Sequence, residues 1–128
     1  MIKVMLMMRR APHLTHEQFI EYWMGAHATL ALTHQDKDGV VRYVQNHRRT
    51  HPVAEAAASV RGCTLGEYDG IAEAWYESFD AMIAAGAHLP AGFAEAVLAD
   101  EGKFIDLESS VIWFSEEIVR KPWDPARG

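Results

Sequence analysis

The segment Thr15–Leu32 constrains the fold most, because it predicts a long amphipathic helix with a marked start. Thr15 and Gln18 have the spacing of a capping box, in which each residue satisfies a free backbone N–H of the other. Leu14 precedes the cap and Phe19 follows at the fourth helical position, which is the arrangement of a hydrophobic staple. A helix of this kind is stable when its apolar face packs against another layer.

One stripe of this helix carries side chains at intervals of four, four and three residues: Phe19, Trp23, His27 and Leu30. His27 therefore faces the same surface as the aromatic residues. A histidine in that position needs a polar partner inside the fold or a ligand that enters it. The sequence leaves two interpretations open, a hydrogen-bonded core histidine and a histidine that serves a site.

The composition predicts one compact domain over residues 1–128, since 49% of the residues are hydrophobic. A formal net charge of −6 and scattered basic residues argue against a nucleic-acid partner. The single cysteine, Cys63, excludes an internal disulfide and favours a reducing compartment. The apolar run Val4–Met8 is too short for a signal peptide or a membrane span. We therefore expect a cytoplasmic protein without a membrane or nucleic-acid partner.

Four short segments have the length and pattern of β-strands: 2–8, 40–47, 68–76 and 111–116. A second helical region is predicted over 79–85 and 93–100. Residues 48–67 form a variable loop with a short helix over 53–60, and 118–128 form a C-terminal tail. The order β-α-β-β-α-β is the ferredoxin-like arrangement of the α+β class, with a four-stranded antiparallel sheet and its helices on one face.

The third predicted strand has two different faces. Small residues alternate on one of them: Gly70, Ala72 and Ala74. They either leave an open volume beneath the helices or allow close helix–sheet packing. The other face carries larger side chains: Ile71, Glu73 and Trp75. We expect a second copy of the chain to cover this face in a homodimer, with Glu73 paired across the interface and Arg42 as its candidate partner.

Six ordered motifs resemble those of the EthD family, named after a protein encoded with an ethyl tert-butyl ether degradation system. They are KVMLMMRR at 3–10, HEQF at 16–19, YWMGAHA at 22–28, RYVQNH at 42–47, YDGIAEAW at 68–75 and DEGKFID at 100–106. The resemblance covers nearly the whole chain apart from 48–67 and the tail. It implies a dimeric α+β barrel but no single reaction, because members lie in oxidative degradation operons and fungal relatives act as decarboxylases or dehydratases in polyketide pathways.

A more distant similarity is to muconolactone methylisomerase and to cofactor-free cyclases and monooxygenases, in which the pocket lies between the sheet and the helices of each subunit. This similarity implies that His27 occupies the position of a pocket histidine and Tyr43 that of a strand tyrosine. Ala74 stands where the methylisomerase has a cysteine, so we expect no thiol chemistry at that position.

The predicted catalytic residues are His27, Tyr43 and His47. An imidazole with an unperturbed pKa of about 6.5 suits a general base, and Tyr43 or His47 can donate to a developing oxyanion. The predicted ligand-binding residues add aromatic walls, an amide and the small-residue gap: Phe19, Trp23, Gln45, Gly70, Ala72, Ala74 and Phe93. The hypothesis is proton abstraction beside the carbonyl of a hydrophobic or aromatic compound, leading to cyclisation, isomerisation, dehydration or decarboxylation.

Two other classes of protein fit the same pattern. One is a non-catalytic accessory protein that carries a hydrophobic intermediate for an oxidative degradation system. The other is a cofactor-free or haem-linked monooxygenase. The chain has seven histidines, but none stands in an H-E-x-x-H motif or with cysteines in a zinc pattern. We expect no metal and no cofactor.

Overall fold

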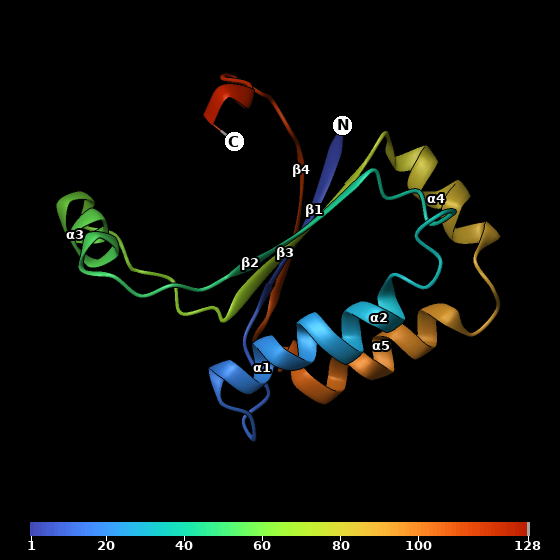
Figure 1. Ribbon diagram of the computed structural model, residues 1–128, viewed down its shortest axis with the longest axis horizontal. Helices are drawn as coiled ribbons and strands as arrows, with labels where there is room; N and C mark the ends of the chain where they lie inside the picture. Colours follow the sequence, from blue (N-terminus) through green and yellow to red (C-terminus); the bar gives the residue numbers. More distant parts are fainter. Residues whose placement is uncertain (128) are drawn as a thin grey trace.

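A twisted four-stranded antiparallel sheet carries the fold in the computed structural model, which describes residues 1–127 (Figure 1). Its strands are β1 (Ile2–Met8), β2 (Arg42–His47), β3 (Gly70–Tyr76) and β4 (Val111–Glu116). They lie in the order β2-β3-β1-β4, so β1 and β3 form the central pair and β2 and β4 are the edge strands. This arrangement confirms the predicted α+β, ferredoxin-like class.

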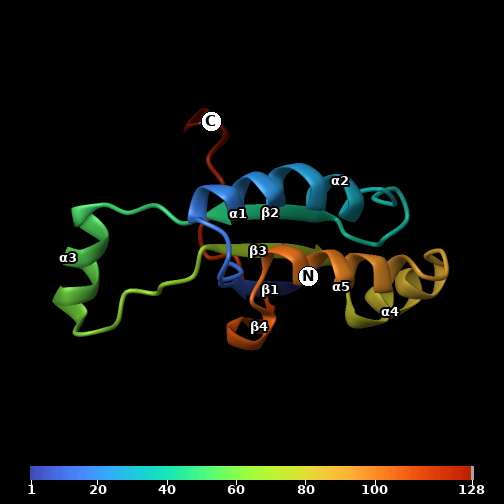
Figure 2. The ribbon, with the colours of Figure 1, turned by 90° about the horizontal axis from the view of Figure 1, so that it is seen from below.

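Helices cover one face of the sheet. They are α1 (His16–Tyr22), the π-helical turn η1 (Trp23–His27), α2 (Ala28–Ala31), α4 (Phe79–His88) and α5 (Phe93–Phe104). Figure 2 shows α1, η1 and α2 as one continuous rod beside α5, with α4 at one end of the sheet. The capping box forms as predicted, because Gln18 N–H donates to Thr15 Oγ1 at 3.1 Å and Thr15 N–H donates to Gln18 Oε1 at 2.9 Å.

The core lies where this rod, α5 and the sheet meet. Its buried residues are Met8, Phe19, Trp23, Phe104 and Ile105. Gly70 lies directly beneath the ring of Trp23, where a Cβ would come within 2.5 Å of Cζ3. The glycine therefore allows the indole to pack directly against β3, and it creates no open volume of its own.

The opposite face of the sheet is left open by the described helices (Figure 1). Trp75 is nonetheless only 6% exposed, because Lys3 and Arg42 lie over its ring and its Nε1–H donates to Glu117. Glu73 accepts hydrogen bonds from Lys3 at 2.7 Å and from Asn46 at 2.8 Å. Glu73 thus has partners within its own chain. Arg42 stacks on the ring of Trp75 and forms no ion pair with Glu73 of the same chain.

The segment between β2 and β3 forms an arm that stands away from the body (Figures 1 and 2). It carries α3 (Pro52–Arg61), close to the short helix predicted over 53–60. The helix begins at His51, whose Nδ1 accepts from Val53 N–H, and ends at Gly62, which adopts a left-handed φ of +65°. None of its residues is buried.

Two short 3₁₀ turns complete the described chain: η2 (Leu107–Ser109) and η3 (Pro125–Arg127). Gly128, the last residue of the predicted tail, lies outside the described residues. Within residues 1–127 no single helix has both the length and the apolar character needed to cross a membrane; α4 and α5 have them only in combination, and they meet at a bend of 102°.

Candidate functional site

A cavity of about 400 Å³ lies between the helical layer and the sheet. Its floor comes from three strands: Leu6, Met8, Tyr43, Ala72, Ala74 and Tyr76. Its cover comes from the helices and their ends: Trp23, His27, Ala31, Met82, Val97, Glu101 and Ile105. Leu32, Asp38, Val40, Gly86 and Leu89 complete the lining. The walls are mainly apolar with a few polar groups, which is the usual character of a small-molecule site.

His27 reaches this cavity from the π-helical turn η1, at the end of five residues that the sequence pattern presents as ordinary α-helix. π-Helical turns are rare and frequently occur at functional sites. His27 is 7% exposed, and the centroid of its ring lies 4.8 Å from that of Phe104. Its Nδ1 lies 2.8 Å from Oδ2 of Asp100 on α5, so the two helices are joined by a buried imidazole–carboxylate pair.

Asp100 is held in its charged form by its neighbours. Burial raises the pKa of its carboxyl, but hydrogen bonds from Tyr22 and His27 outweigh burial and bring the pKa below the ordinary 3.8. Tyr22 O–H donates to Oδ1 at 2.6 Å. A carboxylate at Nδ1 selects the tautomer with the proton on Nδ1, which leaves Nε2 of His27 as the basic nitrogen.

Nε2 of His27 has no hydrogen-bond partner within residues 1–127, and it belongs to a side chain that lines the cavity. Among residues 1–127, every fully enclosed side-chain nitrogen or oxygen has a hydrogen-bond partner. No group in that part of the chain hydrogen-bonds to Nε2, so this nitrogen keeps accessible surface, and His27 lines the cavity. The arrangement therefore presents an oriented base to whatever occupies the cavity.

Tyr43 supplies a hydrogen-bond donor on the floor of the same cavity. Its hydroxyl oxygen accepts from Nε1–H of Trp23 at 3.0 Å and from Nε2 of Gln45 at 3.4 Å. Because both partners donate, the hydroxyl proton remains available to a ligand. Burial raises the pKa of Tyr43, which keeps the phenol protonated.

The structure brings together five of the residues named from the sequence: His27, Tyr43, Trp23, Ala72 and Ala74. The other five lie outside the cavity lining: His47, Gln45, Phe19, Gly70 and Phe93. The centroid of the His47 ring lies 5.3 Å from that of Trp23, and its Nε2 lies 3.0 Å from Gln45 Oε1. Phe19 is fully buried in the core.

Phe93 lies at the start of α5, and its ring packs edge-to-face against that of His34 with 4.7 Å between the ring centroids.

Two further residues belong to the site without having been predicted from the sequence, Asp100 and Glu101. The helix predicted over 93–100 ends at Asp100, whereas α5 continues to Phe104 and carries both residues in its last turns. A usable signal was present, because Asp100 and Phe104 are four residues apart and share one helical face. A carboxylate on the same face as a core aromatic residue indicates a buried polar contact.

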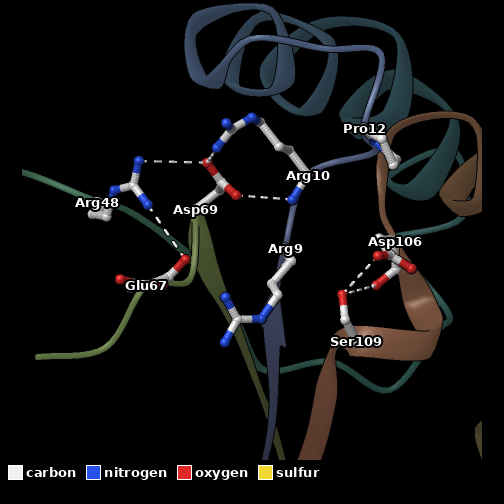
Figure 3. A pocket seen from close by; sticks show the side chains of 8 residues that line it. All are labelled: Arg9, Arg10, Pro12, Arg48, Glu67, Asp69, Asp106 and Ser109. Atoms are coloured by element: carbon white, nitrogen blue, oxygen red, sulfur yellow. Dashed lines mark hydrogen bonds and ion pairs between the residues drawn. The ribbon is translucent and has the colours of Figure 1, made fainter. Parts of the chain in front are cut away.

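A second hollow, also of about 400 Å³, lies at the end of the sheet where β1 leaves and β3 begins (Figure 3). It is lined by Pro12 and by seven polar residues, from four segments in all: Arg9, Arg10, Arg48, Glu67, Asp69, Asp106 and Ser109. Asp69, 2% exposed, accepts from Arg10 N–H at 2.8 Å and Nη1 at 3.0 Å, and its Oδ1 lies 2.9 Å from His16 Nδ1.

Burial raises the pKa of Asp69, but the hydrogen bonds from Arg10 and His16 outweigh it and lower the pKa overall. Arg48 adds a second guanidinium 3.7 Å from Oδ1. The carboxylate thus fastens the end of β1, the start of α1 and the start of β3 to one another. No group of three or more metal-ligating side chains lies close enough to hold an ion anywhere in the described residues.

Comparisons with known proteins agree with this architecture. The family model of the EthD domain matches residues 11–108. The crystal structure of an EthD family protein from Bacillus halodurans C-125 superposes with a TM-score of 0.62 at 16% identity, covering 92% of this chain and 99% of the other. An EthD-like protein from Ralstonia eutropha JMP134 gives 0.57 at 16% identity, with 94% of each chain covered.

A dimeric ferredoxin-like protein of unknown function from Thermobifida fusca YX gives a TM-score of 0.56 at 17% identity, covering 89% of this chain and 88% of that one. At such identities the likeness establishes the fold. No curated protein matches the sequence. Because the family model spans most of the chain and the fold agrees with it, this protein belongs to the EthD family.

Proposed function

We propose that this protein binds a flat hydrophobic carbonyl compound between its helices and its sheet, and abstracts a proton beside the carbonyl without a cofactor. The observation that carries the proposal is the buried His27–Asp100 pair, 2.8 Å long, whose second imidazole nitrogen opens into a mainly apolar cavity. An imidazole oriented in this way by a carboxylate is a general base suited to neutral pH.

Tyr43 completes the proposed chemistry. Removal of a proton beside a carbonyl moves negative charge to the carbonyl oxygen, and a donor fixed in place lowers the barrier to that step. The phenol of Tyr43 lies in the same cavity as His27, and Trp23 and Gln45 hold its oxygen from the other side. Ala72 and Ala74 leave room for a flat ring above β3.

In this proposal the remaining residues named from the sequence support the site without touching the ligand. His47 and Gln45 form a hydrogen-bonded pair next to Trp23, while Phe19 fixes the rod that carries His27. Cyclisation, isomerisation and dehydration all begin with the proposed proton transfer.

The test is exchange of acidic C–H protons for deuterium. Purified protein is incubated in D₂O with neutral aromatic ketones such as 2-tetralone and 1-indanone, and proton NMR follows loss of the signal beside the carbonyl. The wild type is expected to accelerate exchange, and His27→Ala to remove the acceleration. His16→Ala is the matched control, since His16 is bonded to Asp69 outside the cavity. Binding of the ketones without faster exchange would favour an accessory carrier.

We also propose a homodimer in which a second copy covers the open face of the sheet around Ile71, Glu73 and Trp75. Val111 and Trp113 lie on that face of β4 and are 43% and 56% exposed. Large apolar side chains exposed together are typical of an interface. The similar Thermobifida fusca protein is described as dimeric, which supports a dimer but does not identify its interface. Light scattering is expected to give twice 14.4 kDa, and a monomeric mass would contradict the proposal.

A further inference from the structure

The cavity has acidic groups in its wall and, within residues 1–127, no lysine or arginine to balance them. Its ionisable lining residues, within the described chain, are His27, Asp38, Tyr43, Tyr76 and Glu101. Asp100 lies directly behind His27 and stays ionised. Lys103 comes within 3.7 Å of Asp100 Oδ1, but its side chain is 67% exposed and does not line the cavity. A ligand in the cavity therefore meets carboxylates without a facing ammonium or guanidinium group.

Glu101 is the group with the most direct effect on a ligand. It follows Asp100 on α5 and lines the cavity, and its carboxylate makes no hydrogen bond or ion pair with the residues that the structure describes. Burial raises the pKa of its carboxyl, with Asp100 adding to the rise and His27 opposing it. The other carboxylate, Asp38, already accepts from Val40 N–H at 2.9 Å in its turn.

An unpaired carboxylate at an apolar wall discriminates between ligands by charge. A second carboxylate brought into the cavity would lose its hydration, find no ammonium or guanidinium group and lie near a like charge, each of which weakens binding. A hydroxyl group placed there would donate to Glu101 and satisfy it, and a charge-assisted hydrogen bond is among the stronger ones.

We propose that Glu101 determines specificity by admitting uncharged hydroxylated carbonyl compounds and rejecting carboxylates. The inference rests on the proposed function, because it takes the same cavity as the binding site. It narrows the reaction to cyclisation, isomerisation or dehydration of a neutral substrate. Decarboxylation begins from a carboxylate, which this wall disfavours.

The test compares ligands that share a ring system and differ in charge or in one hydroxyl. Methyl 6-hydroxy-2-naphthoate is neutral at pH near 7, whereas 6-hydroxy-2-naphthoate is an anion, and methyl 2-naphthoate lacks the hydroxyl. Isothermal titration calorimetry gives the Kd of each. The wild type is expected to bind the hydroxy ester at least about tenfold more tightly than the anion, and more tightly than the ester without the hydroxyl.

Glu101→Gln keeps the shape of the side chain and removes its charge. This variant is expected to narrow the ester-to-anion ratio to within about threefold, mainly through tighter binding of the anion. Glu95→Gln makes the same change on an exposed position of α5 outside the cavity lining, and should keep the wild-type ratio. Thermal melts of both variants show whether each is folded.

Three outcomes would overturn the inference: equal binding of ester and anion by the wild type, an unchanged ratio in Glu101→Gln, or no binding of the hydroxy ester. The outcome is separable from the proposed catalysis, because calorimetry needs no turnover. His27→Ala should lose deuterium exchange and keep the preference for the ester. A charge preference without proton exchange would leave Glu101 as the selector of a carrier protein.

Discussion

Two buried aspartates, Asp69 and Asp100, look alike in their nearest contacts and differ in what surrounds them. Each lies within 2.9 Å of the Nδ1 of a histidine, and each has a lowered pKa. Asp69 is also bound by the backbone and guanidinium of Arg10, beside a polar hollow (Figure 3). Asp100 has no arginine partner within the described chain, and its histidine opens into a mainly apolar cavity.

The two pairs share a histidine–carboxylate contact, and only the pair at Asp100 lies at the cavity of the proposed function. At Asp69 the arginines neutralise the carboxylate whether or not His16 is charged, so the cluster serves to join strand ends. At Asp100 the imidazole is the main partner besides Tyr22, and its free nitrogen reaches a cavity. The position of that free nitrogen, and the number of permanent cations around the carboxylate, separate the two roles.

The largest expected difference between the two pairs is in proton exchange. His27→Ala should slow wild-type exchange of a bound ketone by about 100-fold or more, because it removes the general base. Asp100→Asn should slow it by about tenfold or more, because an amide no longer selects the Nδ1–H tautomer. His16→Ala and Asp69→Asn should stay within about threefold of the wild type. Deuterium exchange followed by NMR measures the rate for all four variants. Equal losses of exchange rate at the two histidine–aspartate pairs would contradict the distinction between them.

The next difference is in stability, where the substitution at Asp69 is expected to have a larger effect than the one at Asp100. Asp69→Asn should lower the free energy of unfolding by about 2 kcal/mol, because Arg10 and the strand ends lose a charged acceptor. Asp100→Asn should lower it by about 1 kcal/mol, since it affects a neutral phenol and an imidazole. Urea unfolding followed by circular dichroism gives both values. A larger loss of stability in Asp100→Asn than in Asp69→Asn would contradict the structural role given to Asp69.

Gly70 connects the two regions, because it follows Asp69 and lies beneath Trp23 of the cavity. Gly70→Ala should destabilise the fold by at least about 1 kcal/mol and displace the indole, since its Cβ would approach Trp23 Cζ3 to 2.5 Å. Gly102→Ala is the control: it lies in α5, a Cβ there meets nothing within 4 Å, and alanine favours helix. Thermal melts should therefore shift in opposite directions, and a neutral Gly70→Ala would show that the indole has room to move.

The smallest difference appears in acid. Hydrogen bonds to the charged forms keep both aspartate pKa values below the ordinary 3.8. Each carboxylate therefore stabilises the fold at pH above 3.8, and this contribution is lost as the pH falls through the lowered pKa. The stability of Asp69→Asn should approach that of the wild type over this range, and Asp100→Asn should do so from a smaller gap. Urea unfolding at several pH values tests this, and a gap independent of pH would contradict it.

Local patterns predicted the features that depend on neighbouring residues. The capping box at Thr15, the strand positions and the division of β3 into two faces follow from spacing alone, and the structure has them. The same alternation places Tyr43 and Ala74 opposite each other on β2 and β3. Together with the helical stripe, this was sufficient to bring His27 and Tyr43 to one cavity.

Contacts between segments far apart in the chain could not be predicted from the sequence. His27 and Asp100 are 73 residues apart, and no spacing rule joins them. The π-helical turn and the last turn of α5 depend on tertiary packing, so helix boundaries from local signals fell short at Asp100. His47 lies on the expected face of β2, but the volume of Trp23 separates it from the cavity, and side-chain volume is not visible in an alternation pattern.

The arm that carries α3 leaves the sheet and returns to it at adjacent points, since Arg48 N–H donates to the carbonyl oxygen of Asp69 at 3.1 Å. The whole arm is thus inserted at one end of the β2–β3 pair, and the sheet with its helices does not depend on the length of the arm. Substitutions and changes of length in α3 can therefore accumulate without altering the cavity between the helices and the sheet.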